Sequence, residues 1–141
     1  MSAPAEDLRG SCLCGAVGFV LTTPPLAMGN CHCGRCRKHH GTAFATFVEI
    51  AREGFQLLRG AEQIRSFASS PGVERRFCAH CGSKLLFVMH DYPHRLWVAA
   101  GALDDEPALQ PEYHIFVGSK ASWFVIDDEL PQHVAYPGEA S

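Results

Sequence analysis

The sequence predicts a single, mainly β domain, and three observations lead to that class. The chain has 141 residues, which suits one domain of roughly 100–150 residues. Short runs of β-branched, aromatic and small residues recur along it and are bounded mostly by Gly, Pro or Asp. Seven cysteines form three groups, and an odd number cannot be fully paired into disulfides within one chain. The pattern favours an all-β sandwich or barrel with few short helical turns over alternating strands and helices.

Eight short runs are the candidate strands. In chain order they are 15–22, 42–50, 55–59, 63–67, 84–89, 96–100, 114–117 and 123–126. The first is stopped by Pro24 and Pro25, because proline cannot donate to a strand ladder. A short turn at Gly60-Ala61 separates the third run from the fourth. The one helical candidate is the segment 35–40, one or two turns directly after the triple cysteine group.

Aromatic side chains on these runs are the candidate core. The phenylalanines that we expect to be buried are Phe19, Phe44, Phe47, Phe55, Phe67, Phe77 and Phe87. Trp97 and Trp123 are expected to pack between sheets, with the lining of a pocket as the alternative. The histidines beside turn residues, His90, His94 and His133, are expected at the surface.

Composition restricts the partners of the domain, which we expect over residues 8–133. Small, acidic, proline-containing ends at 1–7 and 134–141 predict a disordered N-terminus and a C-terminal tail. Twelve basic and fifteen acidic residues give a net charge of −3, which argues against nucleic acid as a partner. No apolar run approaches the ~20 residues that span a membrane. The first ten residues lack a signal-peptide pattern, and the odd number of cysteines argues against a disulfide-bonded protein. We therefore expect a cytoplasmic protein with reduced cysteines.

Cysteine spacing is typical of zinc sites. Cys78-Ala79-His80-Cys81-Gly82 is a knuckle in which two thiolates from one turn converge on an ion, and Gly82 supplies the conformational freedom needed after the second ligand. Cys12-Leu13-Cys14-Gly15 is a shorter version. A closed structural zinc takes four ligands, and an open catalytic zinc takes three. Seven cysteines divide into four and three.

The triple group, Cys31, Cys33 and Cys36, is the natural three-ligand site, because three thiols within six residues can face one ion. Three alternatives stay open. A histidine could complete a second structural zinc, with His32, His39 and His40 available; the thiols could be reduced and free of metal; or Cys12 and Cys14 could join Cys31 and Cys33.

Basic residues surround the triple group. Arg35, Arg37 and Lys38 would lower the pKa of the thiols and could receive the carboxylates of an anionic substrate, although a basic run on a turn is also typical of a solvated surface. Arg75 and Arg76 could pair with Glu74 or with acidic loops, and we assign them no role.

The order of the three cysteine motifs resembles the glutathione-dependent formaldehyde-activating enzyme family, which includes the centromere protein V-like proteins. The motifs stand at 12–15, 31–37 and 77–83, and the similarity continues through 100–105, 114–117, 119–123 and 130–132.

The resemblance implies a mostly antiparallel β fold with two Zn²⁺ ions. It implies a structural zinc on Cys12, Cys14, Cys78 and Cys81, and a catalytic, more labile zinc on Cys31, Cys33 and Cys36. The implied activity is carbon–sulfur lyase chemistry, in which glutathione and formaldehyde form S-hydroxymethylglutathione or the adduct is cleaved. His32, His39 and His114 are candidate proton donors, and His32 is the one that we expect to be catalytic. The alternative is a non-enzymatic β module in which both metals are structural and a protein partner is bound.

Overall fold

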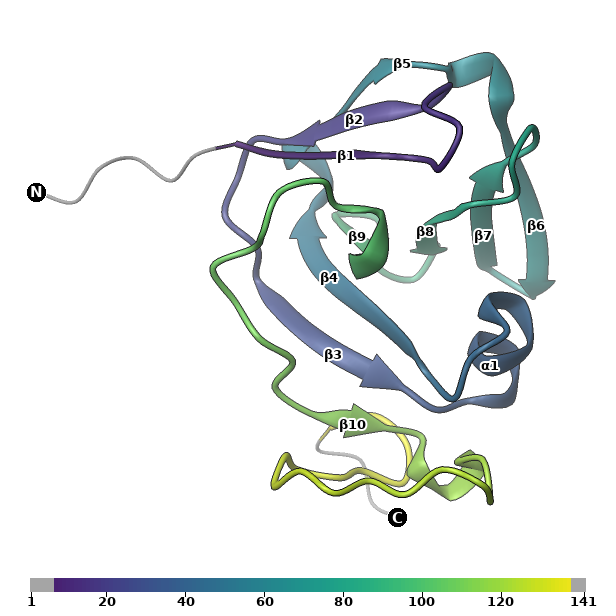
Figure 1. Cartoon of the computed structure of the whole chain (residues 1–141), viewed down its shortest axis with the longest axis vertical. Coiled ribbons are helices and arrows are strands. Elements are labelled where there is room, and N and C mark those ends of the chain that lie inside the picture. The colour runs from purple at the N-terminus through teal and green to yellow at the C-terminus, as the bar shows by residue number, and fades with distance from the viewer. Residues whose placement is uncertain (1–6, 138–141) are drawn as a thin grey trace, which may run out of the picture.

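Two β-sheets make up the computed structural model, which describes residues 7–137 (Figure 1). The predicted disorder at 1–6 and the end of the predicted tail at 138–141 lie outside the described residues. A three-stranded sheet has the order β1 (Leu8–Ser11), β2 (Gly18–Leu21), β5 (Phe55–Arg59). A seven-stranded sheet has the order β10 (His114–Ile115), β3 (Ala27–Cys31), β4 (Ala45–Ala51), β9 (Arg95–Ala99), β8 (Lys84–Met89), β7 (Val73–Cys78), β6 (Ile64–Ser70).

The helical content is small, as predicted. The α-helix α1 covers Gly34–His40, and it ends where Gly41 adopts a left-handed conformation with φ 66°. The backbone N–H of Gly41 donates to the Arg37 carbonyl at 2.8 Å. Four 3-10 turns lie at Arg52–Gly54, Ala61–Gln63, Ala100–Ala102 and Val117–Ser119. The mainly β, mostly antiparallel fold is confirmed; the parallel pair among the named strands is β3 with β10.

The larger sheet has two different faces, because successive side chains of a strand point to opposite sides. One face carries buried aliphatic residues such as Val48, Ile50 and Val98, which join Phe19 and Leu21 of the smaller sheet in the main core. The other face is aromatic: it carries the alternate residues Phe47, Phe87 and Trp97, which pack around the triple cysteine group. The main core therefore lies between the two sheets, and the triple cysteine group lies on the far face of the larger sheet.

Two predicted strands are present but lie in different sheets, and a third predicted strand is absent. The runs 55–59 and 63–67 are both strands, but β5 and β6 belong to different sheets and do not pair with each other. The strand predicted at 123–126 is absent, and its prediction was wrong. The backbone N–H of Phe124 donates to the carbonyl of Ala121. This bond closes a turn, and a turn cannot form the hydrogen bonds of a β-sheet.

Two aromatic residues predicted to be buried are exposed. Trp123 is 69% exposed because it stands on that turn rather than between sheets. Trp97 is half-buried, but it packs on the far face of the larger sheet and lines a cleft instead of lying between the sheets. Phe67 is 58% exposed because β6 is the edge strand of the larger sheet. The expected surface positions of His90 and His94 are confirmed, whereas His133 is half-buried.

Three strands were not predicted, namely β1, β3 and β7. Each carries residues that weaken a β pattern, such as glycine, asparagine or arginine, and each is held by pairing with a neighbour. On β3, Gly29 also admits a close neighbour: a Cβ atom there would stand 2.1 Å from the Tyr113 ring. The segment 134–137, within the predicted tail, contacts the domain, because the Phe116 N–H donates to the Ala135 carbonyl.

Candidate metal sites and cleft

Four of the seven thiols converge from two distant turns. The Sγ atoms of Cys12 and Cys14 are 3.6 Å apart, and those of Cys14 and Cys78 are 3.9 Å apart. With Cys81, all four sulfurs lie within 4.8 Å of one another. Zinc–thiolate bonds of ~2.3 Å in a tetrahedron separate sulfurs by about 3.8 Å, whereas a disulfide requires ~2.05 Å. The spacing therefore fits one tetrahedral metal ion.

Two glycines allow the backbone to turn directly after each cysteine pair of this four-cysteine group. Gly15 and Gly82 follow the second cysteine of each pair and have φ values of 81° and 79°, which a residue with a side chain rarely adopts. The Ser83 hydroxyl lies 3.2 Å from the Cys81 sulfur. Its hydrogen bond, followed by one from the Cys14 backbone, lowers the pKa of the Cys81 thiol to about 5. Cys81 therefore favours the thiolate form that binds metal.

The other three thiols converge locally, where β3 meets α1. Cys31 ends β3, Cys33 is the N-cap of α1, and Cys36 lies in the first turn of that helix. Their sulfurs also lie within 4.8 Å of one another, and no His, Asp or Glu of the described residues joins them. Hydrogen bonds from Cys31 and Cys36 lower the pKa of Cys33, and the same sharing of protons raises the pKa of Cys31.

A buried arginine contacts this three-cysteine group. Arg75 on β7 is 3% exposed, and its Nη1 lies 3.4 Å from the Cys36 sulfur. Its Nε donates to the Ser69 hydroxyl at 3.0 Å, and its guanidinium lies over the Phe87 ring at 5.0 Å. A fixed positive charge at this position offsets the negative charge of clustered thiolates. Arg75 has no assigned role in the sequence-based prediction; the one signal in the sequence is its position two residues before Phe77 of the Phe-Cys motif.

His32 does not join the three sulfurs, although it stands between Cys31 and Cys33 in the chain. The His32 ring is fully buried, and its Nε2 lies 2.8 Å from Nδ1 of His114. Nε2 of His114 lies 2.9 Å from the Asp128 carboxylate. Burial lowers the pKa of His32 to about 4, with the neighbouring His114 adding to the effect. His32 is therefore neutral and belongs to a His32–His114–Asp128 chain that joins β3 to the C-terminal segment.

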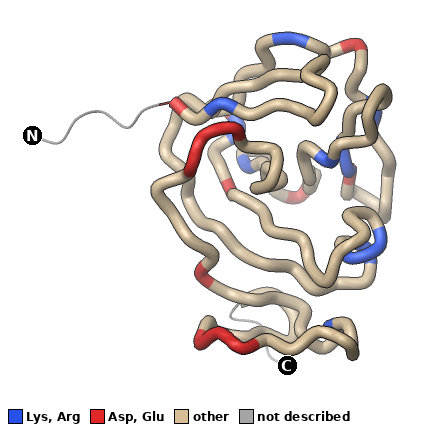
Figure 2. The backbone as a smooth tube through the Cα atoms, viewed as in Figure 1, with Lys and Arg blue, Asp and Glu red and all other residues tan. Residues whose placement is uncertain are grey.

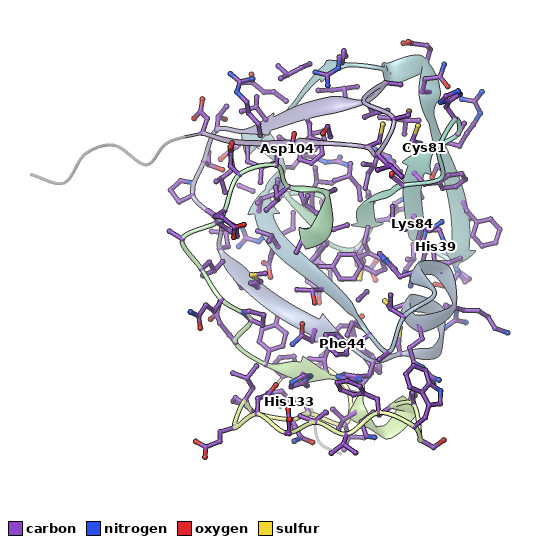
Figure 3. All side chains as sticks on the ribbon, viewed as in Figure 1. His39, Phe44, Cys81, Lys84, Asp104 and His133 are labelled. Atoms are coloured by element: carbon purple, nitrogen blue, oxygen red, sulfur yellow. The ribbon has the colours of Figure 1, made fainter. Side chains whose placement is uncertain are left out.

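Burial also keeps His39 and His40 neutral at ordinary pH, because desolvation lowers the pKa of each ring to about 4. Figure 3 shows the labelled His39 on α1 beside Lys84, and both residues line a small hollow under the helix. The two cysteine groups are separate: Cys12 and Cys78 belong to the main core, whereas Cys31 and Cys36 belong to the smaller cluster.

A cleft of about 670 Å³ opens beside the three-cysteine group, a size typical of small-molecule sites. All three cysteines of that group line it, together with Arg35 and Arg75. Its aromatic lining comprises Phe47, Phe87, Tyr92, Trp97, Tyr113, Phe116 and Tyr136, which includes every tyrosine of the chain.

Of the three predicted substrate-binding cations, Arg35 and Lys38 line a shallow hollow that includes Cys33, whereas Arg37 does not. Arg35 lines the cleft. Arg37 donates to the Ser119 carbonyl at 2.9 Å, and with Lys38 it lines a different hollow next to Trp123. Figure 2 shows basic residues on α1 and a run of acidic residues at 127–129 on the C-terminal segment. Arg35 is thus the one of these three cations that lines the cleft.

No helix in the described part of the chain has the length and apolar character needed to cross a membrane.

Comparison with known proteins gives a consistent result. The family model described as "Glutathione-dependent formaldehyde-activating enzyme" matches residues 7–119. A Halomonas elongata protein named "Putative glutathione-dependent formaldehyde-activating enzyme" is 30% identical in an alignment 143 positions long, and the alignment covers 94% of this chain and 90% of the relative. An uncharacterized lyase of Schizosaccharomyces pombe is 26% identical, covering 88% of this chain and 95% of the relative. A crystal structure of a Rhodobacter sphaeroides protein shares the fold, with a TM-score of 0.60 and 21% identity over 71% of this chain and 91% of that one.

Proposed function

The chain belongs to the glutathione-dependent formaldehyde-activating enzyme family, and from this premise we propose that it is a zinc-dependent carbon–sulfur lyase. The substrate is a thiol–aldehyde adduct such as S-hydroxymethylglutathione, which the enzyme forms from glutathione and formaldehyde or cleaves. We extend the proposal to a cytoplasmic location, where thiols stay reduced and glutathione is abundant.

The observation that carries the proposal is the position of the three-cysteine group at the wall of the large cleft. Three thiol ligands, with no His, Asp or Glu donor among the described residues to complete them, match an open zinc site that has a position for substrate. The four-cysteine group matches a closed structural site. We therefore assign Cys31, Cys33 and Cys36 to a catalytic Zn²⁺, and Cys12, Cys14, Cys78 and Cys81 to a structural Zn²⁺.

Zinc, when bound, supplies a Lewis acid that favours the thiolate form of the substrate sulfur. In cleavage, the carbon–sulfur bond breaks, its electron pair goes to sulfur, the hydroxyl proton passes to solvent water in the cleft and the carbonyl double bond forms. Addition reverses each step. The reaction needs no oxidant or reductant, in keeping with a site that offers thiols, cations and aromatic rings.

The chain's own groups orient these partners. Arg75 holds a positive charge against the Cys36 sulfur, and Arg35 is placed at the cleft to receive a substrate carboxylate. His32 does not line the cleft, so we assign it a positioning role: through His114 and Asp128 it fixes the end of β3 that carries Cys31.

The experiment that tests the proposal combines metal content with turnover. Zinc is added to the purified chain, excess ion is removed, and zinc per chain is measured by elemental analysis. Exchange between free glutathione and S-hydroxymethylglutathione is then followed by NMR. We expect two zinc ions per chain and an exchange rate well above that of the uncatalysed mixture.

Cys33→Ser is the matched variant. It is expected to retain one zinc, remain folded and lose the accelerated exchange. Accelerated exchange that survives in Cys33→Ser, or wild-type protein with two zinc ions and no acceleration, would contradict the proposed function.

A further inference from the structure

One wall of the cleft next to the three-cysteine group is a row of aromatic rings, Phe47, Phe87, Trp97 and Tyr92, which we call the aromatic floor. Formaldehyde has a single carbon atom and is too small to cover this row. Strand register places Arg75, Phe87, Trp97 and Glu49 side by side across β7, β8, β9 and β4. Ring centroids of Phe47 and Phe87 are 5.6 Å apart, and those of Phe87 and Trp97 are 5.9 Å apart. Tyr92 continues the row at 6.2 Å from Trp97. The floor therefore runs from the cysteine group outward as a continuous row of rings.

A second aromatic pair lines the cleft from the C-terminal segment. Phe116 and Tyr136 meet with their ring centroids 4.9 Å apart and their planes at 81°. Both residues line the cleft with Trp97, and Phe116 also packs against the cysteine group. A planar apolar group entering next to the sulfurs would meet rings from the sheet and rings from this segment.

Most charged groups that line the cleft already have an ionic or hydrogen-bond partner within the protein. Glu49 is paired with Arg95 at 3.2 Å, and Arg75 is held by Cys36 and Ser69. Arg35 is exposed, and its side chain makes no hydrogen bond or ion pair within residues 7–137. Glutathione carries two carboxylates and an ammonium group, which need ionic partners. These groups fit the rim near Arg35, and they do not fit the row of rings.

We infer that the carbonyl component of the adduct carries an aromatic group, so that the favoured substrates are hemithioacetals of glutathione with aromatic aldehydes. This inference rests on the proposed function and specifies its substrate class. The balance is unchanged: the carbon–sulfur bond breaks, sulfur keeps the electron pair, the hydroxyl proton is released, and the aromatic aldehyde leaves. The aryl ring packs on the floor, and the glutathione arms extend to Arg35.

Binding of stable thioethers tests the inference without turnover. S-benzylglutathione and S-methylglutathione differ by one aryl ring and do not react, and their dissociation constants are measured by calorimetry on the zinc-loaded full chain. We expect S-benzylglutathione to bind at least tenfold more tightly. In Trp97→Ala this preference is expected to fall to about threefold or less. Trp123→Ala is the matched control, because that tryptophan lies outside the cleft, and it should keep the full preference.

Fluorescence provides a second readout if Trp97→Ala does not fold. Trp123→Phe leaves Trp97 as the single tryptophan, and Trp97→Phe leaves Trp123. S-benzylglutathione is expected to change the emission of the first variant and leave the second unchanged. Equal affinity for the two thioethers, or a response from Trp123 alone, would overturn the inference.

Turnover separates this inference from the proposed function. Exchange is followed by NMR for glutathione with formaldehyde, glutathione with benzaldehyde, and phenylmethanethiol with formaldehyde. We expect the second pair to show the greatest acceleration over its uncatalysed rate. Greatest acceleration of the first pair overturns the inference and leaves the proposed function standing. Greatest acceleration of the third pair assigns the aryl group to the thiol and also overturns it. No acceleration with any pair overturns the proposed function itself.

Discussion

The two cysteine groups use the same ligand atoms in opposite ways. The four-cysteine group joins turns that are 64 positions apart in the chain, and two of its members, Cys12 and Cys78, are part of the main core. The three-cysteine group lies within six residues and belongs to the smaller cluster at the cleft. A metal that cross-links distant segments restricts the unfolded chain, whereas a metal held by one local turn restricts it little. Under the proposed function, one residue type therefore serves stability in one place and chemistry in another.

The largest expected effect comes from breaking the four-cysteine group. Cys78→Ser removes a fully buried ligand and opens a loop of about 64 residues, so loop closure alone is worth roughly 4 kcal/mol. We expect the variant to lose one zinc and to be unfolded or strongly destabilised at 25 °C. Circular dichroism and elemental analysis measure both effects. A Cys78→Ser protein with wild-type stability would remove the structural role from this group.

Cys33→Ser breaks the three-cysteine group and sharpens the contrast. Cys33 is the N-cap of α1, and its sulfur accepts the Cys36 N–H at 3.3 Å. Serine is a favoured N-cap, so the helix keeps this bond and the free energy of unfolding should change by less than about 1 kcal/mol. Exchange activity is expected to fall at least 100-fold. Destabilisation equal to that of Cys78→Ser would show that the two groups do not differ in role.

Arg75→Met tests whether the buried cation acts on the three-cysteine group alone. Loss of this contact is expected to weaken zinc retention there by about 10–100-fold and to leave the four-cysteine zinc in place. A competition assay with a chelator resolves the two metals by their release. Arg75→Lys keeps the charge without the planar guanidinium and should fall between the two proteins. Equal loss from both groups would indicate a general packing defect.

Asp128→Asn is expected to have the smallest effect, and its effect should depend on pH. The hydrogen bond from His114 lowers the pKa of Asp128 in the folded protein, so the carboxylate stabilises the fold above its ordinary pKa of 3.8. That contribution is lost as the pH falls through the lowered pKa. Denaturation of wild type and Asp128→Asn should therefore differ at pH 7 and converge toward pH 3. The difference between the proteins isolates the carboxylate, because zinc loss in acid is common to both; a constant difference across this range would contradict the assignment.

Local pattern predicted much of the fold. The strand at 84–89 coincides with β8, and the helix was placed to within a residue, because both are set by side chains next to one another in the chain. Trp123 and Phe67 were misplaced because their exposure depends on a turn and on an edge position, which neighbouring residues do not encode. The strands β1, β3 and β7 escaped prediction because pairing, more than composition, holds them in the sheets.

The sequence by itself determined the cysteine chemistry, because ligand type and knuckle spacing are local properties of the chain. Its clusters favoured a division of the seven thiols into four and three, and left open a grouping of Cys12 and Cys14 with Cys31 and Cys33; the structure instead brings Cys12 and Cys14 together with Cys78 and Cys81. Only the tertiary structure decided what surrounds them. Arg75 reaches Cys36 across 39 positions of sequence, and His32 contacts His114 instead of joining the sulfurs between which it stands. The aromatic floor exists because strand register aligns residues of β4, β8 and β9 on one face, and that alignment comes from sheet pairing across the whole fold.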